Sequence, residues 1–112
     1  MRCAGPLDLL PGHRRLALAV LAAHLPLGSA IWVFGSRATG RARPLSDLDL
    51  AIDAGRRLTL DEIAGLAEAF TESDLPYRVD IVDWHAIDEP FRQAIAAERV
   101  ALCEAIPVGV PP

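Results

Sequence analysis

Two aspartates near the middle of the chain, Asp47 and Asp49, have the type and spacing that could hold metal ions. The segment from Asp47 to Asp53 alternates acidic and apolar residues. Side chains on a β-strand alternate between its faces, so the segment predicts a strand with Asp47, Asp49 and Asp53 on one face. The opposite face, expected in the core, carries Leu48, Leu50 and Ile52. Carboxylates two residues apart repel each other unless a cation lies between them, and oxygen ligands favour Mg²⁺ or Mn²⁺.

A glycine and a serine earlier in the chain have the character of a phosphate-binding turn. The apolar, β-branched and aromatic run Ile31 to Phe34 predicts a buried strand, and Gly35 and Ser36 end it. Glycine lets the backbone approach a ligand closely, and the N–H groups that follow can point at a bound anion. The pattern indicates a phosphate-sized site.

A third carboxylate is expected on the same face of the sheet. The segment Tyr77 to Trp84 predicts another strand. If Val79 and Ile81 face the core, Asp80 lies on the face that carries the other aspartates, and Asp83 points away or ends the strand. Three carboxylates form the set that two-metal phosphoryl chemistry uses.

The connection between the turn and the acidic strand contains further candidates for phosphate binding. Arg37, Arg41 and Arg43 lie there, and guanidinium groups pair well with phosphate oxygens. We prefer Arg37 because it directly follows Ser36, and Ser46 is a further candidate. A solvated basic loop and ordinary Ser-Asp turn chemistry are the alternatives for these residues.

An Asp-x-Asp pair alone is more often a solvated sheet face than a metal site. The combination with a Gly-Ser turn ten residues earlier favours a site. The pattern resembles the signature of the nucleotidyltransferase superfamily, which includes DNA polymerase β and kanamycin nucleotidyltransferase. Here the pattern consists of Gly35-Ser36, ten further residues, and Asp47-Leu48-Asp49. At this length the chain resembles the minimal members, the MntA-type antitoxins that are paired with HEPN-domain toxins.

The resemblance implies a fold and a chemistry. The expected fold is α/β (α+β), a small mixed β-sheet with helices packed on one face. The implied reaction transfers AMP from ATP to a protein hydroxyl, a tyrosine of a HEPN toxin that forms a hetero-oligomer with this chain. By the same resemblance Asp47, Asp49 and Asp80 are catalytic and hold two Mg²⁺ ions, and the nucleotide is bound by Gly35, Ser36, Arg37 and Ser46.

Two other functions stay open at this point. One is an antitoxin that silences the toxin by complex formation alone, with vestigial acids. The other is a nucleotidyltransferase for a small, aminoglycoside-like acceptor, which the shortness of the chain disfavours because no second domain holds the acceptor.

Length and composition set the remaining expectations. We expect one domain over residues 1–106 of the 112, followed by a disordered Pro-rich tail over residues 107–112. The net charge of −4, with arginine as the only basic residue apart from histidine, argues against direct nucleic-acid binding. The apolar segments are too short or too interrupted for a signal peptide or a membrane span, so we expect a cytoplasmic protein.

Three helices are expected around the strands. The first begins near Pro11 to His13, and the second starts at a capping box formed by Thr59 and Glu62. The third covers residues 86–105, within which residues 100–102 have the character of a short last strand.

Overall fold

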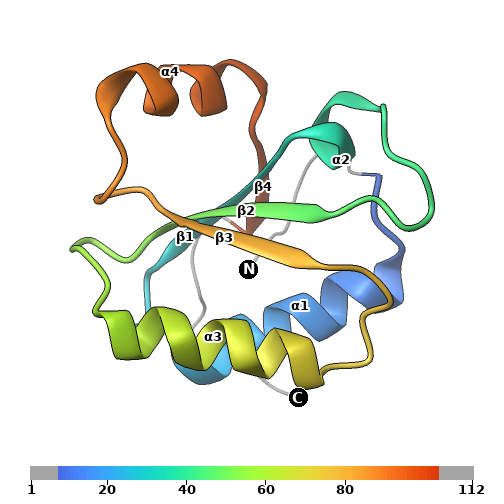
Figure 1. Ribbon diagram of the computed structural model, residues 1–112, viewed down its shortest axis with the longest axis horizontal. Coiled ribbons are helices and arrows are strands. Elements are labelled where there is room, and N and C mark those ends of the chain that lie inside the picture. The colour runs from blue at the N-terminus through green and yellow to red at the C-terminus, as the bar shows by residue number, and fades with distance from the viewer. Residues whose placement is uncertain (1–7, 104–112) are drawn as a thin grey trace.

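The computed structural model describes residues 8–103, which form a four-stranded sheet with helices on both sides (Figure 1). The strands are β1 (Ala30–Phe34), β2 (Leu48–Asp53), β3 (Val79–Asp83) and β4 (Val100–Cys103). The helices are α1 (Pro11–His24), α2 (Ser36–Thr39), α3 (Leu60–Glu72) and α4 (Glu89–Glu98). The predicted α/β fold with a small mixed sheet is confirmed.

The strand order β3-β2-β1-β4 places the Gly35 turn and the two acidic strands next to one another. β1 pairs with β2 and with β4 in antiparallel register, whereas β2 pairs with β3 in parallel register. The parallel pair needs a crossover connection, and α3 supplies it. The ends of β1, β2 and β3 that carry the candidate residues therefore belong to three adjacent strands.

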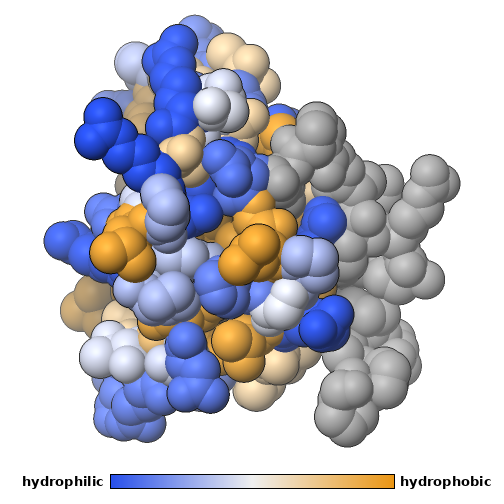
Figure 2. Space-filling model, turned by 90° about the vertical axis from the view of Figure 1, so that its right-hand side faces the viewer, coloured by the Kyte–Doolittle hydropathy of each residue, from blue (hydrophilic) through white to orange (hydrophobic). Residues whose placement is uncertain are grey.

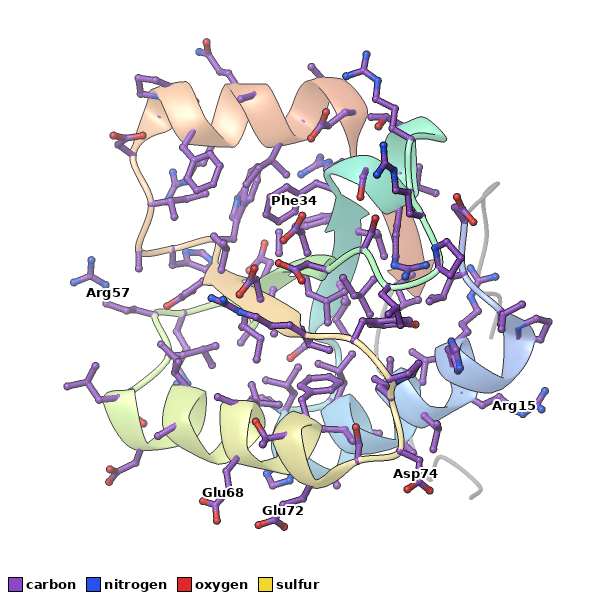
Figure 3. The ribbon with its side chains drawn as sticks, turned by 45° about the vertical axis from the view of Figure 1, so that its right-hand side comes forward. Arg15, Phe34, Arg57, Glu68, Glu72 and Asp74 are labelled. Atoms are coloured by element: carbon purple, nitrogen blue, oxygen red, sulfur yellow. The ribbon has the colours of Figure 1, made fainter. Side chains whose placement is uncertain are left out.

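One face of the sheet packs against α1 and α3, as Figure 1 shows below the strands. Leu48, Leu50 and Ile52 are fully buried there, as the alternating pattern predicted. Both helices contribute fully buried leucines, Leu21 and Leu66. Glu68 and Glu72 of α3 point away from the sheet (Figure 3), so they take no part in a carboxylate cluster.

The predicted starts of the first two helices are confirmed. α1 begins at Pro11. In α3 the Thr59 hydroxyl accepts a hydrogen bond from the N–H of Glu62, and the Glu62 carboxylate accepts one from the N–H of Thr59. Asp88 caps α4 by accepting a hydrogen bond from the N–H of Phe91 at 3.0 Å. These bonds satisfy backbone donors that the first turn of a helix leaves without partners.

The other face of the sheet is covered in part by α4, so the prediction that the helices pack on one face is wrong; α4 lies there because its Phe91 packs against Phe34 of the sheet. Phe34 of β1 lies on the α4 side of the sheet (Figure 3), with its ring centroid 6.1 Å from that of Phe91. The rings of Trp32 and Trp84 contact each other in a tilted arrangement on this face, with centroids 5.2 Å apart, and the Arg99 guanidinium lies 4.0 Å from the centre of the Trp32 ring. These aromatic side chains cover part of this face of the sheet, and the aspartates lie next to the covered part.

The predicted final helix over residues 86–105 is too long at both ends. α4 starts at Glu89 and ends at Glu98, and residues 100–103 form β4 instead, so the suggested short last strand is confirmed. The helix stops because Arg99 adopts an extended conformation (φ −62°, ψ 145°) and the chain then pairs with β1. The predicted tail over residues 107–112 lies outside the described residues. Within residues 8–103, no helix is long and apolar enough to cross a membrane.

Candidate active site

Asp49 and Asp80 occupy paired positions on the neighbouring strands β2 and β3. Side chains at paired positions project from the same face of a sheet, and here it is the face opposite the core. The prediction that Asp80 joins the face of Asp49 is confirmed at the level of strand register. Asp47 lies two residues before Asp49, just outside β2, and is exposed. Three carboxylates thus come from one corner of the sheet.

Negative charge at this corner disfavours the ionised form of Asp49. Burial, followed by the charges of Asp80 and Asp47, raises the pKa of Asp49 from 3.8 to about 6. Burial penalises a charge, and neighbouring carboxylates add repulsion, so both effects favour the protonated acid. Glu98 contributes repulsion as well. A cation bound among these carboxylates would therefore stabilise the ionised form of Asp49.

Gly35 brings the backbone of the turn directly against Asp49. Its φ of 74° and ψ of −155° belong to a region that only glycine adopts readily. A Cβ atom at this position would collide with Oδ2 of Asp49. The pairing of Phe34 with Asp49 accounts for this closeness, because Gly35 directly follows Phe34 in β1. The predicted turn and the predicted acids therefore meet.

The two serines predicted to bind phosphate have different surroundings. Ser36 is the first residue of α2, next to Gly35, and its carbonyl accepts a hydrogen bond from the N–H of Arg41. The Ser46 hydroxyl accepts a hydrogen bond from the N–H of Arg43 at 2.8 Å. Ser36 therefore adjoins the turn, whereas the Ser46 side chain fastens the connection that leads into β2.

The Arg37 side chain is not brought together with the carboxylates. It is only 5% exposed, and its guanidinium stacks 4.0 Å from the centre of the Tyr77 ring. Its nitrogens donate to backbone carbonyls of Asp8, Pro44 and Ser46 at 2.9, 3.1 and 2.8 Å, and to that of Arg43 at 3.4 Å. The α2 turn directs this side chain to the inside of the loop, so these contacts suit a residue that fixes the loop.

Glu98 is a residue of the site that the sequence analysis missed. Its Oε1 accepts a hydrogen bond from the Gly35 N–H at 2.9 Å, although the two residues are 63 positions apart in the chain. The available signal was the expected short strand over residues 100–102, because a strand paired with β1 brings the preceding residues beside Gly35.

Asp53 lies on the same face as Asp49 but belongs to a separate contact. His85 Nε2 lies 2.6 Å from Asp53 Oδ1, and the Gly55 N–H donates to the same oxygen at 2.8 Å. These contacts outweigh the effect of burial and lower the pKa of Asp53. Asp53 is four residues from Asp49, about 13 Å along a strand. Asp53 can therefore serve as a control for Asp49, because it is an aspartate on the same strand and face but outside the site.

The donor set suits a hard divalent cation. Within residues 8–103, no three His, Cys, Asp or Glu side chains converge into a ready-made group of metal ligands. The donor oxygens at the corner are nevertheless carboxylate oxygens, and burial together with the charges of Asp80 and Asp47 raises the pKa of Asp49. Oxygen ligands of like charge are the chemistry that Mg²⁺ prefers. The residues present therefore fit such an ion.

Two surface hollows lie on the described part of the chain, and a residue of the corner lines the first of them. One of about 600 Å³ lies between α3 and β3, and Asp80 is its only acidic lining residue. Another of about 710 Å³ lies between the start of α1 and the α2–β2 connection, where Arg37 and Arg43 line it. Figure 2 looks at the side of the molecule that carries α2 and shows apolar side chains in small groups among hydrophilic ones. The exposed leucines of the described chain include Leu10 and Leu45.

Comparisons with known proteins agree with this geometry. A Haemophilus influenzae protein assigned as the protein adenylyltransferase MntA is 47% identical over 74 residues, which cover 66% of this chain and 65% of that protein. The chain thus spans just under two thirds of that relative. A crystal structure of a toxin–antitoxin with AMP-PNP matches with 25% identity and a TM-score of 0.70, over 80% of this chain and 72% of the other.

A solved structure assigned as a minimal nucleotidyltransferase matches with 34% identity and a TM-score of 0.62, over 80% of this chain and 88% of the other. The model of the family described as polymerase beta, nucleotidyltransferase, matches residues 23–106. That match spans β1, the Gly35 turn, all the predicted acids and β4. The chain belongs to the polymerase β nucleotidyltransferase family.

Proposed function

We propose that the protein is a Mg²⁺-dependent adenylyltransferase that transfers AMP from ATP to a hydroxyl group of a partner protein. The observation that carries the proposal is the pairing of Asp49 with Asp80 beside the glycine-specific turn at Gly35. The same corner combines a carboxylate set for a cation with a backbone turn for phosphate. Nucleotidyl transfer needs both parts.

The proposed acceptor is a tyrosine of a cognate HEPN-domain toxin, which makes the protein an antitoxin that works in a hetero-oligomer. Support comes from the relatives. The Haemophilus influenzae protein is assigned as a protein adenylyltransferase, and the crystal structure with AMP-PNP contains a toxin–antitoxin. A toxin partner and a supply of ATP both suit the cytoplasmic location predicted from the sequence.

In the proposed reaction the acceptor hydroxyl oxygen forms a bond to the α-phosphorus of ATP. The bond between that phosphorus and the bridging oxygen to the β-phosphate breaks, and pyrophosphate leaves. Asp80 takes the proton of the hydroxyl. Asp47, Asp49 and Asp80 would hold Mg²⁺, which when bound neutralises phosphate charge and lowers the pKa of the attacking hydroxyl.

The turn and the loop have separate tasks in this proposal. Ser36 orients the β- and γ-phosphates through its hydroxyl and N–H, and Gly35 forms the turn that presents Ser36, since the Gly35 N–H is itself bonded to Glu98. Arg37 and Ser46 hold the connection between α2 and β2 in place, so that Asp47 enters the corner in a fixed position. Positioning of this kind contributes to catalysis because it removes the need to order the reacting groups.

Mass spectrometry of the partner protein tests the proposal. The purified protein is incubated with ATP, Mg²⁺ and the candidate HEPN protein, and the mass of an AMP group is sought on a partner tyrosine. Asp49→Asn should give no modification. Asp53→Asn is the matched control on the same strand and should modify the partner as the wild type does. Equal modification by all three proteins would contradict the proposed site.

A further inference from the structure

Glu98 is the one side chain in the described chain that joins α4 to the Gly35 turn by a hydrogen bond. Its Oε1 accepts from the Gly35 N–H at 2.9 Å. The Gly35 N–H is therefore already bonded before any ligand arrives. The contact needs an explanation because Glu98 adds negative charge to a corner that already carries three aspartates.

The register of the sheet explains why Glu98 lies there. Val33 of β1 pairs with Val100 of β4 in antiparallel register. Continuing the register by two residues beyond this pair sets Gly35 opposite Glu98. The last residue of α4 is thus held against the turn by the same pairing that closes the sheet.

The neighbouring backbone groups indicate what the bond achieves. Gly35 occupies a conformation that only glycine adopts readily, and its carbonyl accepts from the N–H groups of Ala38 and Thr39 at 3.0 and 3.2 Å. With Glu98 on its N–H, both backbone polar groups of Gly35 are bonded. A turn tied at both groups keeps one orientation, which a bound phosphate requires.

We infer that Glu98 is a positioning residue of the nucleotide site, which holds the Gly35 turn in the conformation that receives the phosphates. The inference rests on the proposed function for the identity of the ligand. Glu98 acts through Gly35 and does not itself contact the nucleotide. The carboxylate matters for its oxygen acceptor and not for its charge, so a neutral acceptor of the same length should replace it.

Binding of AMP-PNP in the presence of Mg²⁺, measured by isothermal titration calorimetry, tests the inference. Glu98→Ala removes the acceptor and should weaken binding about 5- to 10-fold, the equivalent of one hydrogen bond. Glu98→Gln keeps an acceptor oxygen and should bind within about 2-fold of the wild type. Glu89→Ala removes the same charge from the exposed first turn of α4 and should also bind like the wild type.

Two results would overturn the inference. If Glu98→Ala binds AMP-PNP as tightly as the wild type or more tightly, Glu98 does not support the site. If Glu98→Gln is as impaired as Glu98→Ala, the charge matters and not the acceptor. Thermal melts of all variants establish that the compared proteins are folded.

Amide hydrogen exchange at Gly35 separates this inference from the proposed function, because it needs no nucleotide. The Gly35 amide should be protected in the wild type and in Glu98→Gln, and should exchange at least 10-fold faster in Glu98→Ala. If the wild type binds no nucleotide but this pattern holds, the proposed function fails and the role of Glu98 in fixing the turn stands. Equal exchange in all three proteins would overturn it.

Discussion

Asp49 of β2 and Asp80 of β3 stand side by side in parallel register, on the face of the sheet opposite the core. Neighbouring strands rarely place two carboxylates in adjacent positions without a compensating charge, because like charges directly opposite one another destabilise a sheet. Arg78 compensates in part, since its Nε donates to Asp80 Oδ1 at 2.9 Å. That arginine is largely exposed, so solvent weakens its effect.

The variant Asp49→Asn should lose nucleotidyl transfer while keeping the fold. Asparagine has nearly the same shape but carries no charge, so it holds a divalent ion poorly, and the rate should fall by on the order of 100-fold or more. Initial rates at saturating ATP and Mg²⁺ measure the loss. A variant with more than half of the wild-type rate would remove Asp49 from the mechanism.

The same variant should alter the pH dependence of stability. The pKa of Asp49 is raised to about 6 in the folded protein from 3.8. Between these values the folded state binds more protons than the unfolded state, so the stability contributed by this group falls as pH rises from about 4 to about 6. Above pH 6 the contribution is constant.

Without divalent ions, Asp49→Asn should therefore be more stable than the wild type at pH 7, and the difference should shrink as the pH approaches 4. Urea unfolding at pH 4, 5, 6 and 7 in the presence of EDTA measures this difference. A difference that grows as pH falls would mean that Asp49 is stabilised as the anion, contrary to the charge arrangement described above.

Replacement of Gly35 should damage both stability and activity. Gly35→Ala introduces a Cβ that collides with Oδ2 of Asp49, and it forces alanine into a conformation that costs about 1–3 kcal/mol. Gly55→Ala is the control, because Gly55 also has a positive φ (79°) but has open space around it. It should cost about 1 kcal/mol and leave transfer intact.

Denaturant unfolding and transfer rates on these two glycine variants separate the backbone effect from the collision with Asp49. Equal destabilisation by both substitutions, with transfer retained in both, would show that the turn and Asp49 are not in contact.

Arg37→Lys distinguishes a residue that fixes the loop from a phosphate ligand. Lysine keeps the charge but cannot reach the carbonyls of Asp8, Pro44 and Ser46 together, so part-buried hydrogen bonds worth about 1 kcal/mol each are lost. The free energy of unfolding should fall by on the order of 3 kcal/mol. Arg41→Lys, at an exposed position, should change it by less than about 0.5 kcal/mol.

Thermal or urea unfolding and AMP-PNP affinity are measured for both arginine variants. An Arg37→Lys protein of unchanged stability with weakened nucleotide binding would support the original prediction that Arg37 binds phosphate.

The strands and their acids were predictable from sequence, whereas the surroundings of two residues were not. The period of two in a strand fixes which face Asp49 and Leu50 occupy, and that periodicity is visible in the sequence. Arg37 follows Ser36 in the chain, but its direction depends on the short helix α2 and on Tyr77, which is 40 positions later. Position next to a turn therefore says little about where a long side chain points.

Glu98 illustrates the other limit. Its partner Gly35 is 63 residues away, and the contact depends on where α4 ends and β4 begins. Element boundaries are the least reliable part of any interpretation from one sequence, and a shift of one residue in β4 would place a different side chain on Gly35.

The most direct test of the central claim follows the two ends of the ATP molecule separately. The protein, Mg²⁺ and the candidate partner are incubated with ATP labelled at the α-phosphate, and in parallel with ATP labelled at the γ-phosphate. We predict that the α-label becomes bound to the partner and that the γ-label is released in pyrophosphate, and that Asp47→Ala/Asp49→Ala abolishes both. Transfer of the γ-label to the partner, or silencing of the partner without any transferred label, would contradict the account.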